Sequence, residues 1–530
     1  MVRAGVAWML LAASAMAQDG PRIAWDATPV WAARTALADA QGLPADVATR
    51  SRYVWLRGGS RDELAALSFV VNSTLSRVNI GILPGTSPGA VPFAGGRLVR
   101  LDFGILATDA DDLANLAATW EKLARVETDF GTTIETREIV TIPRTFIDGK
   151  WRTRQWKVAR VRFQAPPEAV ELSAILGGTG VPIIDGRQLM ATALTTLEGG
   201  QYYSFRGLTL GMKLTDYLRS RGASQEQVDQ LESMEKAVIL NSAITGKQRM
   251  VKVFRGAGVR ASTGGGIVSI TLDQFDEDRS IGDSPIHNLL TFEGQGFEVI
   301  VELANGFHEW TLWNAAGELV AVAPPNLASD HRIPEPYTRN LQPGLGCIRC
   351  HAAEDGWRGL KNDVPRILAA GTDIFGDLSD PGDRLKSVQL LAGLYSGDWF
   401  EAGVGPLAVG RLTYDRACFQ VTGKPVDETS LLISAMYDGY AYQLLDCWAV
   451  AKELGIEGLP ASDGNAETDD DVQAACGVLR QFIGAAPIDG AVAREDPILA
   501  SILAGIPVSR RSWQSAAHIA YERCYTRANK

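Results

Sequence analysis

The residues of this chain best suited to chemistry are Cys347, Cys350 and His351, which end the stretch Gly-Cys-Ile-Arg-Cys-His. Two cysteines separated by two residues and followed at once by histidine form the attachment pattern of c-type haem. Each thiolate adds to one vinyl group on the same edge of the porphyrin. The histidine then lies under the ring, where its Nε2 can ligate iron. The pattern predicts one covalent haem c per chain, with His351 as the proximal iron ligand.

The segment before the motif contains Pro343, Gly344 and Gly346, a flexible approach that would let the backbone pass close to a flat macrocycle. Other uses of the two cysteines fit less well. A structural zinc site needs four ligands, and the chain has no second Cys-x-x-Cys. A thioredoxin-like pair would follow a strand-to-helix transition instead of a Pro/Gly loop. A disulfide across two residues would be strained.

The sixth iron ligand has several candidates, because Met, His, water or no ligand can occupy that position. Met436 is the only methionine after the motif, and its alternative role is to fill a leucine-rich core. His331 lies in a polar segment, where it could equally be a solvated surface residue. His308 lies on the apolar side of a predicted hairpin, where it could be a packed core histidine. His287 and His518 are weaker candidates, and an open sixth site is the remaining alternative.

The first seventeen residues have the features of a secretory signal peptide. Arg3 provides a positive start, an apolar stretch follows, and Ala15-Met16-Ala17 matches the small-x-small cleavage rule. No later run reaches the 18 or more apolar residues that span a bilayer. The sequence therefore predicts a periplasmic or secreted protein without a transmembrane segment after signal removal.

The net charge of the chain limits the kinds of molecule that it is suited to bind. Removing the signal takes away one arginine and no acid, which leaves 50 basic and 62 acidic residues and a net charge of −12. An acidic protein is poorly suited to nucleic acid or to an anionic membrane surface. A redox partner protein with a basic surface is compatible with this charge.

Four cysteines remain after the motif, namely Cys418, Cys447, Cys476 and Cys524. In an oxidising compartment an even number of such cysteines predicts two disulfides. Proximity in sequence favours Cys418 with Cys447 and Cys476 with Cys524. Four buried free thiols are the alternative.

The 530 residues are too many for one core. We expect an α+β multidomain protein: a mixed N-terminal domain, a small antiparallel hairpin sheet leading into a cytochrome c-like haem segment, and a helix-rich C-terminal region. The expected boundaries are 1–17 for the signal, 18–165 for the α+β domain, 166–290 for a mainly helical region, 291–380 for hairpin and haem segment, and 381–530 for the helical C-terminal domain.

Local patterns predict individual elements. Ser60 with an acid three residues later forms a capping box, and Asp109 begins a second helix. Residues 97–103 alternate as a strand. Asp273 begins an acidic stretch whose spacing does not match a calcium loop, which predicts a solvated loop.

A hairpin precedes the motif. Phe297, Val299, Val301 and Leu303 alternate with acids, and Asn305-Gly306 predicts a two-residue turn. The resulting pairs are Leu303 with His308, Val301 with Trp310, Val299 with Leu312 and, on the opposite face, Glu302 with Glu309. The hairpin is expected to deliver a small sheet directly before the haem motif.

The segment Glu-Val-Ile-Val-Glu-Leu-Ala-Asn-Gly at 298–306, followed by Cys347-x-x-Cys350-His351, resembles a set of uncharacterised exported bacterial proteins. These carry a cytochrome c-like single-haem domain behind an EVIF-x-LPNG hairpin. The likeness extends weakly to Arg52-Tyr53 and the helix after Ser60. Ala304 replaces the proline of that pattern, and His308 stands where glutamine is usual. The resemblance implies haem and export and carries no activity with it.

The leading hypothesis is an exported monohaem c-type cytochrome that transfers single electrons, more an electron carrier than a catalyst. One alternative is a haem enzyme or gas sensor with an open sixth coordination site. Another is an envelope binding protein in which haem is structural.

Overall fold

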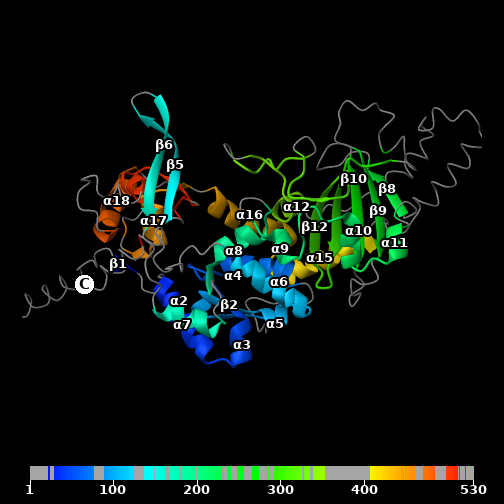
Figure 1. Cartoon of the computed structure of the whole chain (residues 1–530), viewed down its shortest axis with the longest axis horizontal. Helices are drawn as coiled ribbons and strands as arrows, with labels where there is room; N and C mark the ends of the chain where they lie inside the picture. Colours follow the sequence, from blue (N-terminus) through cyan, green and yellow to red (C-terminus); the bar gives the residue numbers. More distant parts are fainter. Residues whose placement is uncertain are drawn as a thin grey trace, which may run out of the picture. The chain divides into compact units, whose positions relative to one another are not determined.

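The computed structural model is a mixed α/β protein with several sheets and many helices, as expected for a multidomain α+β chain (Figure 1). It describes residues 22–23, 29–76, 89–123, 136–147, 150–160, 167–177, 182–196, 200–229, 231, 235–239, 248–255, 266–273, 285, 292–324, 328–334, 338–351, 406–442, 444–457, 459, 469–483, 497–510, 512–513 and 520. Within these ranges, no helix has the length and apolar character needed to cross a bilayer. The predicted signal peptide, His287, His518 and Cys524 lie outside the described residues.

The chain forms two compact units, each assembled from segments that are distant in sequence. Unit 1 comprises residues 1–49, 124–185 and 440–530, and unit 2 comprises residues 50–123 and 186–439. The haem motif belongs to unit 2. Both units are thus assembled from segments that do not follow one another in the sequence.

The first segment of unit 2 confirms several local predictions. Its elements are β2 (Ser51–Trp55), α4 (Arg61–Val70), the π-helix η2 (Val71–Leu75), β3 (Ala90–Phe93), the 3-10 helix η3 (Ala94–Gly96), β4 (Leu98–Asp102), α5 (Phe103–Leu106) and α6 (Ala110–Glu121). Strand β4 pairs antiparallel with both β2 and β3. The Oγ of Ser60 accepts a hydrogen bond from the backbone N–H of Glu63 at 3.1 Å, which closes the predicted capping box. Asp109 caps α6 by accepting from the N–H of Asp112 at 2.8 Å.

The second segment of unit 2 contains the sheet that positions the motif. Its elements are α8 (Gly186–Ala193), α9 (Tyr202–Phe205), α10 (Leu214–Ser220), α11 (Gln225–Asp229), β8 (Glu235–Ile239), β9 (Arg249–Arg255), β10 (Ile267–Asp273), β11 (Gly296–Glu302), β12 (His308–Asn314), β13 (Leu319–Val320), α12 (Leu345–His351), α15 (Pro406–Thr422) and α16 (Val426–Ala441). The six strands β8 to β13 follow one another in sequence order in one antiparallel sheet. The predicted small sheet is therefore larger than expected, because β8, β9 and β10 lie in the region predicted to be mainly helical.

The hairpin of β11 and β12 has a three-residue loop, so the predicted two-residue turn and its register are wrong. The N–H of Leu303 bonds the carbonyl of Phe307 at 2.8 Å, and Gly306 takes a φ of 84°. A left-handed third residue is typical of three-residue hairpin loops. The side chain of Asn305 stabilises this loop by donating to the carbonyls of Asn72 and Ser76 at 2.7 and 3.2 Å. The observed pairs include Glu302 with His308, Val301 with Glu309, Ile300 with Trp310 and Val299 with Thr311.

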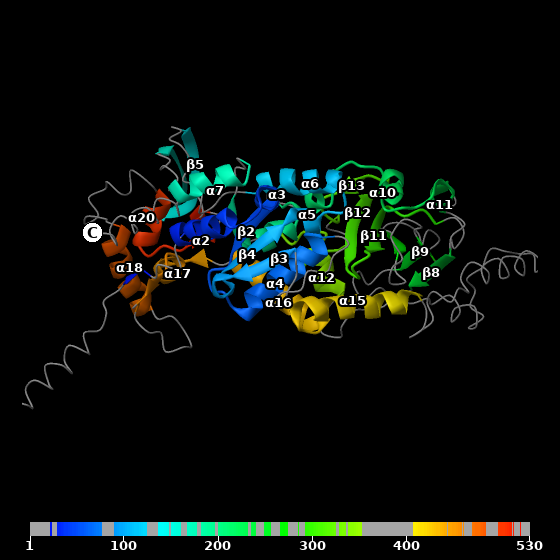
Figure 2. The same cartoon turned by 90° about the horizontal axis from the view of Figure 1, so that it is seen from below.

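This one-residue shift changes which side chains share a face of the sheet, because side chains alternate along a strand. The α10 face carries Val299, Val301, Glu309 and Trp313. The α12 face carries Glu298, Ile300, Glu302, His308, Trp310 and Leu312. Figure 2 shows α10 and α15 on opposite sides of the sheet. Both faces are covered, since β11 and β12 are buried along almost their whole length.

The α10 face holds an apolar core with one buried ionic group. The core residues are Tyr202, Tyr203, Leu208, Tyr217, Leu218, Ala223, Val228, Met250, Phe254, Val268, Ile270, Leu272, Phe292, Val299, Val301, Trp313 and Leu319. Within it, the carboxylate of Glu309 accepts from Arg206 at 2.8 Å, from Arg221 at 2.6 Å and from the Tyr217 hydroxyl at 2.8 Å. These bonds compensate the desolvation of the fully buried Glu309.

Unit 1 is a separate assembly of helices and short strands. Its elements are β1 (Arg22–Ile23), α2 (Pro29–Gln41), α3 (Ala45–Arg50, ending at the unit boundary), β5 (Thr136–Ile147), β6 (Lys150–Arg160), α7 (Pro167–Ile175), β7 (Ile183–Asp185), β14 (Leu444–Leu445), α17 (Cys447–Glu453), β15 (Ile456–Glu457), α18 (Asp469–Ile483), α20 (Pro497–Leu503) and β16 (Val508–Ser509). Among its described residues from 440 onward, α17, α18 and α20 are the longest elements. Buried side chains of α17, α18 and α20 form its core, with Trp513 fully enclosed.

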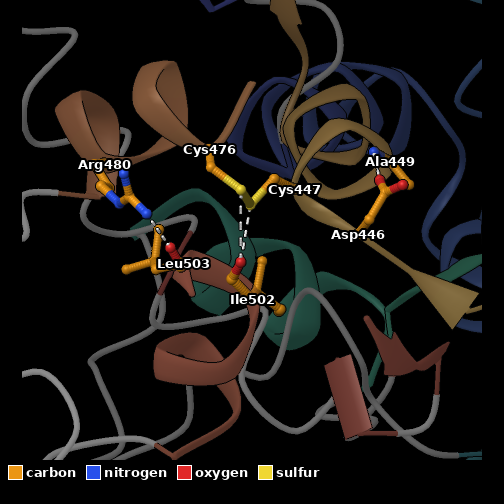
Figure 3. Close-up of a disulfide and its surroundings, with 7 residues drawn as sticks. All are labelled: Asp446, Cys447, Ala449, Cys476, Arg480, Ile502 and Leu503. Carbon is orange, nitrogen blue, oxygen red and sulfur yellow. Dashed lines mark hydrogen bonds between the residues drawn. A yellow bond between two sulfur atoms is a disulfide. The ribbon is translucent and has the colours of Figure 1, made fainter. Parts of the chain in front are cut away.

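One disulfide joins Cys447 of α17 to Cys476 of α18, which corrects the predicted pairing (Figure 3). Both sulfur atoms lie against the carbonyl oxygen of Ile502 in α20, at 2.8 and 3.8 Å. Cys418 is a buried free thiol on α15 of unit 2, so it does not pair with Cys447. Proximity in sequence predicted the wrong pairs, because the packing of α17 against α18 brings Cys447 next to Cys476.

Removing this disulfide is expected to destabilise unit 1. The double variant Cys447→Ala/Cys476→Ala should lose about 3–4 kcal/mol, the chain-entropy value for a loop of about 30 residues. Urea unfolding of the variant and the parent measures this loss, with Cys418→Ala as the control for removal of a thiol. Peptide mapping without reduction should recover the 447–476 linkage and Cys418 as an alkylated thiol. A Cys418 disulfide in that map would contradict the structure.

Candidate functional site

Helix α12 places the three motif side chains together. Successive residues of an α-helix are rotated by about 100°, so positions i, i+3 and i+4 share one side. Cys347, Cys350 and His351 have this spacing, and the helix covers Leu345–His351. Cys347 and His351 are buried, whereas Cys350 is partly exposed. The helix therefore turns two thiols and one imidazole toward the same region, as the attachment chemistry requires.

The glycines before the motif are explained by the protein itself. Gly344 has a φ of 79°, and a Cβ there would lie 2.5 Å from the carbonyl oxygen of Leu194 and 3.0 Å from the Tyr202 ring. A Cβ at Gly346 would lie 2.8 Å from the Leu341 side chain. These glycines let α12 begin tightly against its neighbours.

Glu298 of β11 is the side chain that meets the motif from the sheet. Its Oε1 lies 3.3 Å from Nε2 of His351 and 3.7 Å from the sulfur of Cys347. Its Oε2 accepts a hydrogen bond from Arg249 at 3.1 Å. Arg249 in turn makes two bonds to Asp273, at 2.6 and 2.8 Å. Because Arg249 and Asp273 are paired residues of β9 and β10, the sheet itself fixes this ionic group beside α12.

The charges of this group alter the acidity of their neighbours. Burial would raise the pKa of Glu298, but the charges and hydrogen bonds of His351 and Arg249 outweigh burial and lower it to about 2. Burial, followed by the negative charge of Glu298, raises the pKa of the Cys347 thiol well above its ordinary value. The same burial, with the charges of Asp330 and Glu298, raises the pKa of Cys350 to about 11. Both shifts favour the neutral thiol over the thiolate.

A small cavity connects these groups. It has a volume of about 30 Å³, enough for one or two water molecules. The three motif residues line it together with Arg249, Asp273 and Glu298. The remaining walls are mostly apolar, formed by Phe297, Leu312, Trp313, Val320, Ala323, Pro324, Ala328 and Leu341. The motif thus opens onto an apolar space with one ionic wall.

The donor set of this cavity fits covalent haem, whereas its volume does not. Two thiols at i and i+3, an adjacent imidazole and apolar walls are what thioether attachment and proximal ligation need. Cofactor sites usually enclose about 300–1,000 Å³, so the cavity walls would have to separate. In the part of the chain that the structure describes, no group of three or more His, Cys, Asp or Glu side chains is arranged to hold a bare metal ion.

Arg349, inside the Cys-x-x-Cys spacing, fixes the other side of α12. Its guanidinium donates to Asp330 at 2.9 Å and to Ser434 at 3.2 Å, and it also bonds Asp438. It lies over the ring of Tyr437. Arg349 is buried, so these contacts tie α12 firmly to α16 and to the segment 328–334.

The three candidate sixth ligands within the described residues, Met436, His331 and His308, do not line this cavity. Met436 is a half-buried residue of α16, and His331 is exposed, with its Nε2 3.3 Å from the hydroxyl of Ser329. His308 is buried on the α12 face, stacked on Tyr414 at a ring distance of 4.7 Å. Burial, followed by the charge of His351, lowers its pKa to about 3. His308 lies opposite Glu302, four residues along β11 from Glu298, a separation of about 13 Å along the strand.

Comparison with protein-family models, with curated proteins and with solved structures finds no match to this chain. The interpretation of the site therefore depends on its residues and their geometry.

The sequence analysis missed Arg249 and Asp273 as residues of the site, and it missed the contact that Glu298 makes with the motif. Glu298 was placed on the polar face of a hairpin assumed to be half exposed, and Asp273 was assigned to a solvated loop. Asp273 is instead buried at the end of β10, and Arg249 is buried at the start of β9. The available signal was an arginine and an aspartate at the ends of two short runs that contain valine and isoleucine, where buried charges have to be paired.

Proposed function

We propose that this chain is an exported c-type cytochrome-like protein that carries one covalent haem and transfers single electrons. Cys347 and Cys350 would form the thioethers, and His351 would be the proximal ligand. The observation that carries the proposal is the arrangement of α12, whose two thiols and imidazole share one apolar cavity. When bound, the haem supplies the one-electron couple.

The chain's own residues have three tasks in this proposal. Helix α12 presents the attachment groups, and Arg349 holds that helix in place from outside. The apolar side chains of the cavity would shield a bound haem from water, and such shielding favours a defined reduction potential. The disulfide of unit 1 supports the proposed periplasmic or secreted location, because such bonds persist in oxidising compartments. The acidic chain is suited to a redox partner protein with a basic surface.

The test is direct. Protein produced in a bacterial host that matures c-type cytochromes should retain haem on a denaturing gel. It should also show sharp α and β absorbance bands after reduction with dithionite, with one haem per chain by pyridine haemochrome. Absence of covalent haem in folded protein would overturn the proposal.

An open sixth site, as in a haem enzyme or gas sensor, is favoured by one observation. Among the described residues that line the cavity, the only histidine is His351 and there is no methionine. Carbon monoxide added to the reduced protein distinguishes the two functions. A shift of the main absorbance band indicates an open site, whereas an unchanged spectrum indicates a closed one and an electron carrier.

A further inference from the structure

A second cavity of unit 2 is much larger than the cavity beside the motif. Its volume is about 380 Å³, compared with about 30 Å³ at the motif. The two cavities share no lining residue among those that the structure describes. Sites for small molecules usually enclose about 300–1,000 Å³. Of the two, the larger cavity is therefore the one with room for an organic ligand.

The outer walls of the larger cavity are formed by α6, α9 and the loop that follows α9. The Nδ2 of Asn115 in α6 donates to the carbonyls of Ser204 and Phe205 in α9, at 2.9 and 3.3 Å, and the two helices lie side by side (Figure 1). The chain then turns at Gly207, which has a φ of 69°, and lines the cavity again with residues 208–210. The fold itself therefore sets the shape of these walls.

The inner wall is held by the segment that follows β12 in the six-stranded sheet. The hydroxyl of Tyr203 donates to the carbonyl of Val320 at 3.0 Å and accepts from the N–H of Leu312 at 3.1 Å. The hydroxyl of Thr196 donates to the carbonyl of Ala321. Because these two side chains are fixed by the protein, a ligand does not have to order them when it binds.

The chemical groups of the cavity indicate the kind of ligand. Lys122, the exposed residue that follows α6, is the one charged side chain among the described residues that line it. Three aliphatic hydroxyls and two leucines also line it, from Thr196, Ser204, Thr209, Leu208 and Leu210. A hydroxyl both donates and accepts hydrogen bonds. Since the described lining contains no carboxylate, a ligand cation would have no ionic partner there.

We propose that this cavity binds a small hydroxylated organic anion, whose carboxylate or phosphate group pairs with Lys122. The hydroxyl groups of the ligand bond those of the wall, and its carbon skeleton contacts Leu208 and the ring of Tyr203. Leu210, which is 56% exposed, provides further apolar surface for the ligand to cover. This binding function is additional to electron transfer and does not depend on covalent haem.

Isothermal titration calorimetry of the full chain with four probes tests the proposed ligand class. Gluconate carries a carboxylate and hydroxyls, glucose 6-phosphate carries a phosphate and hydroxyls, sorbitol lacks the charge of gluconate, and hexanoate lacks its hydroxyls. At least one of the two hydroxylated anions should bind with a Kd of about 1 mM or tighter. Sorbitol and hexanoate should each bind about tenfold more weakly or not at all. Which anion binds better distinguishes a carboxylate ligand from a phosphate ligand.

Variants of exposed residues connect this binding to the cavity. Lys122→Gln should weaken binding of the anion about tenfold, the usual contribution of a hydrogen bond to a charged group. Lys213→Gln is the matched control, because Lys213 is also exposed in unit 2 but does not line the cavity. Its affinity should equal that of the parent. Thr209→Trp should abolish binding by filling the cavity, and circular dichroism establishes that each variant is folded.

Three results would overturn the inference. They are binding of neither hydroxylated anion by the parent, equal affinity for gluconate and sorbitol, and parental affinity in folded Lys122→Gln. Folded protein that binds one of the anions but carries no covalent haem would overturn the proposed function and leave this inference standing.

Discussion

Replacing Cys347 and Cys350 together by serine is expected to remove all covalently bound haem. A hydroxyl does not replace a thiol in adding to a vinyl group, so neither thioether can form. Each single variant should retain one linkage and bind haem in reduced amount. His351→Ala should keep the linkages and change the spectrum, because the proximal ligand is lost. Haem staining on a denaturing gel and the pyridine haemochrome assay measure these outcomes.

Cys418→Ser is the matched control for this experiment. Cys418 is also a buried free thiol of unit 2, but it lies on α15 and does not line the cavity of the motif. It should carry haem at the parental level. Undiminished haem staining of the Cys347→Ser/Cys350→Ser variant would contradict the attachment sites. An equal loss of haem in Cys418→Ser would show that the loss follows removal of any buried thiol and is not specific to the motif.

Arg349→Met is expected to destabilise unit 2 by about 3–5 kcal/mol, the usual effect of removing one partner of a buried ion pair. The variant leaves the carboxylate of Asp330 buried, with only 7% of its side chain exposed, and without its guanidinium partner. Asp438 contributes less, since 38% of its side chain is exposed and water can solvate it. Urea unfolding followed by circular dichroism measures the change in the free energy of unfolding.

Lys424→Met serves as the comparison, because Lys424 pairs with Asp62 at the surface and such pairs contribute about 0–1 kcal/mol. The double variant Arg349→Met/Asp330→Asn should recover part of the lost stability, since it removes both buried charges. A loss in Arg349→Met no larger than that in Lys424→Met would show that α12 is held mainly by apolar contacts.

The elements that the sequence predicted well are those determined by neighbouring residues. The capping box at Ser60, the N-cap at Asp109 and the strand β4 depend on side chains within four positions, and all are present. The predicted loop of the β11–β12 hairpin was wrong. In the structure the side chain of Asn305 donates to the carbonyls of Asn72 and Ser76, which lie more than 200 residues earlier in the chain. A register chosen by such a distant contact has no local signature.

In the candidate site, too, the features set by neighbouring residues were predicted and those set by distant residues were not. The motif cysteines and histidine were identified from their spacing alone. The ionic group was missed, because Arg249, Asp273 and Glu298 come from three strands and meet only after the sheet forms. The strand β9 was missed because charged residues stand at both of its ends and, as Lys252, at its centre. Pairing of cysteines likewise depended on how α17 packs on α18.

The discontinuity of the two units has a consequence for the order in which the chain can mature. In a polypeptide threaded across a membrane from its N-terminus, every segment of unit 2 has emerged once residue 439 is through. Unit 1 can be completed only after residues 440–530 have crossed, although its first segments cross before any other part of the chain. Under the proposed function, haem attachment at α12 would therefore not depend on the later closure of the 447–476 disulfide. The early segments of unit 1 cannot complete their compact unit until residues 440–530 follow them.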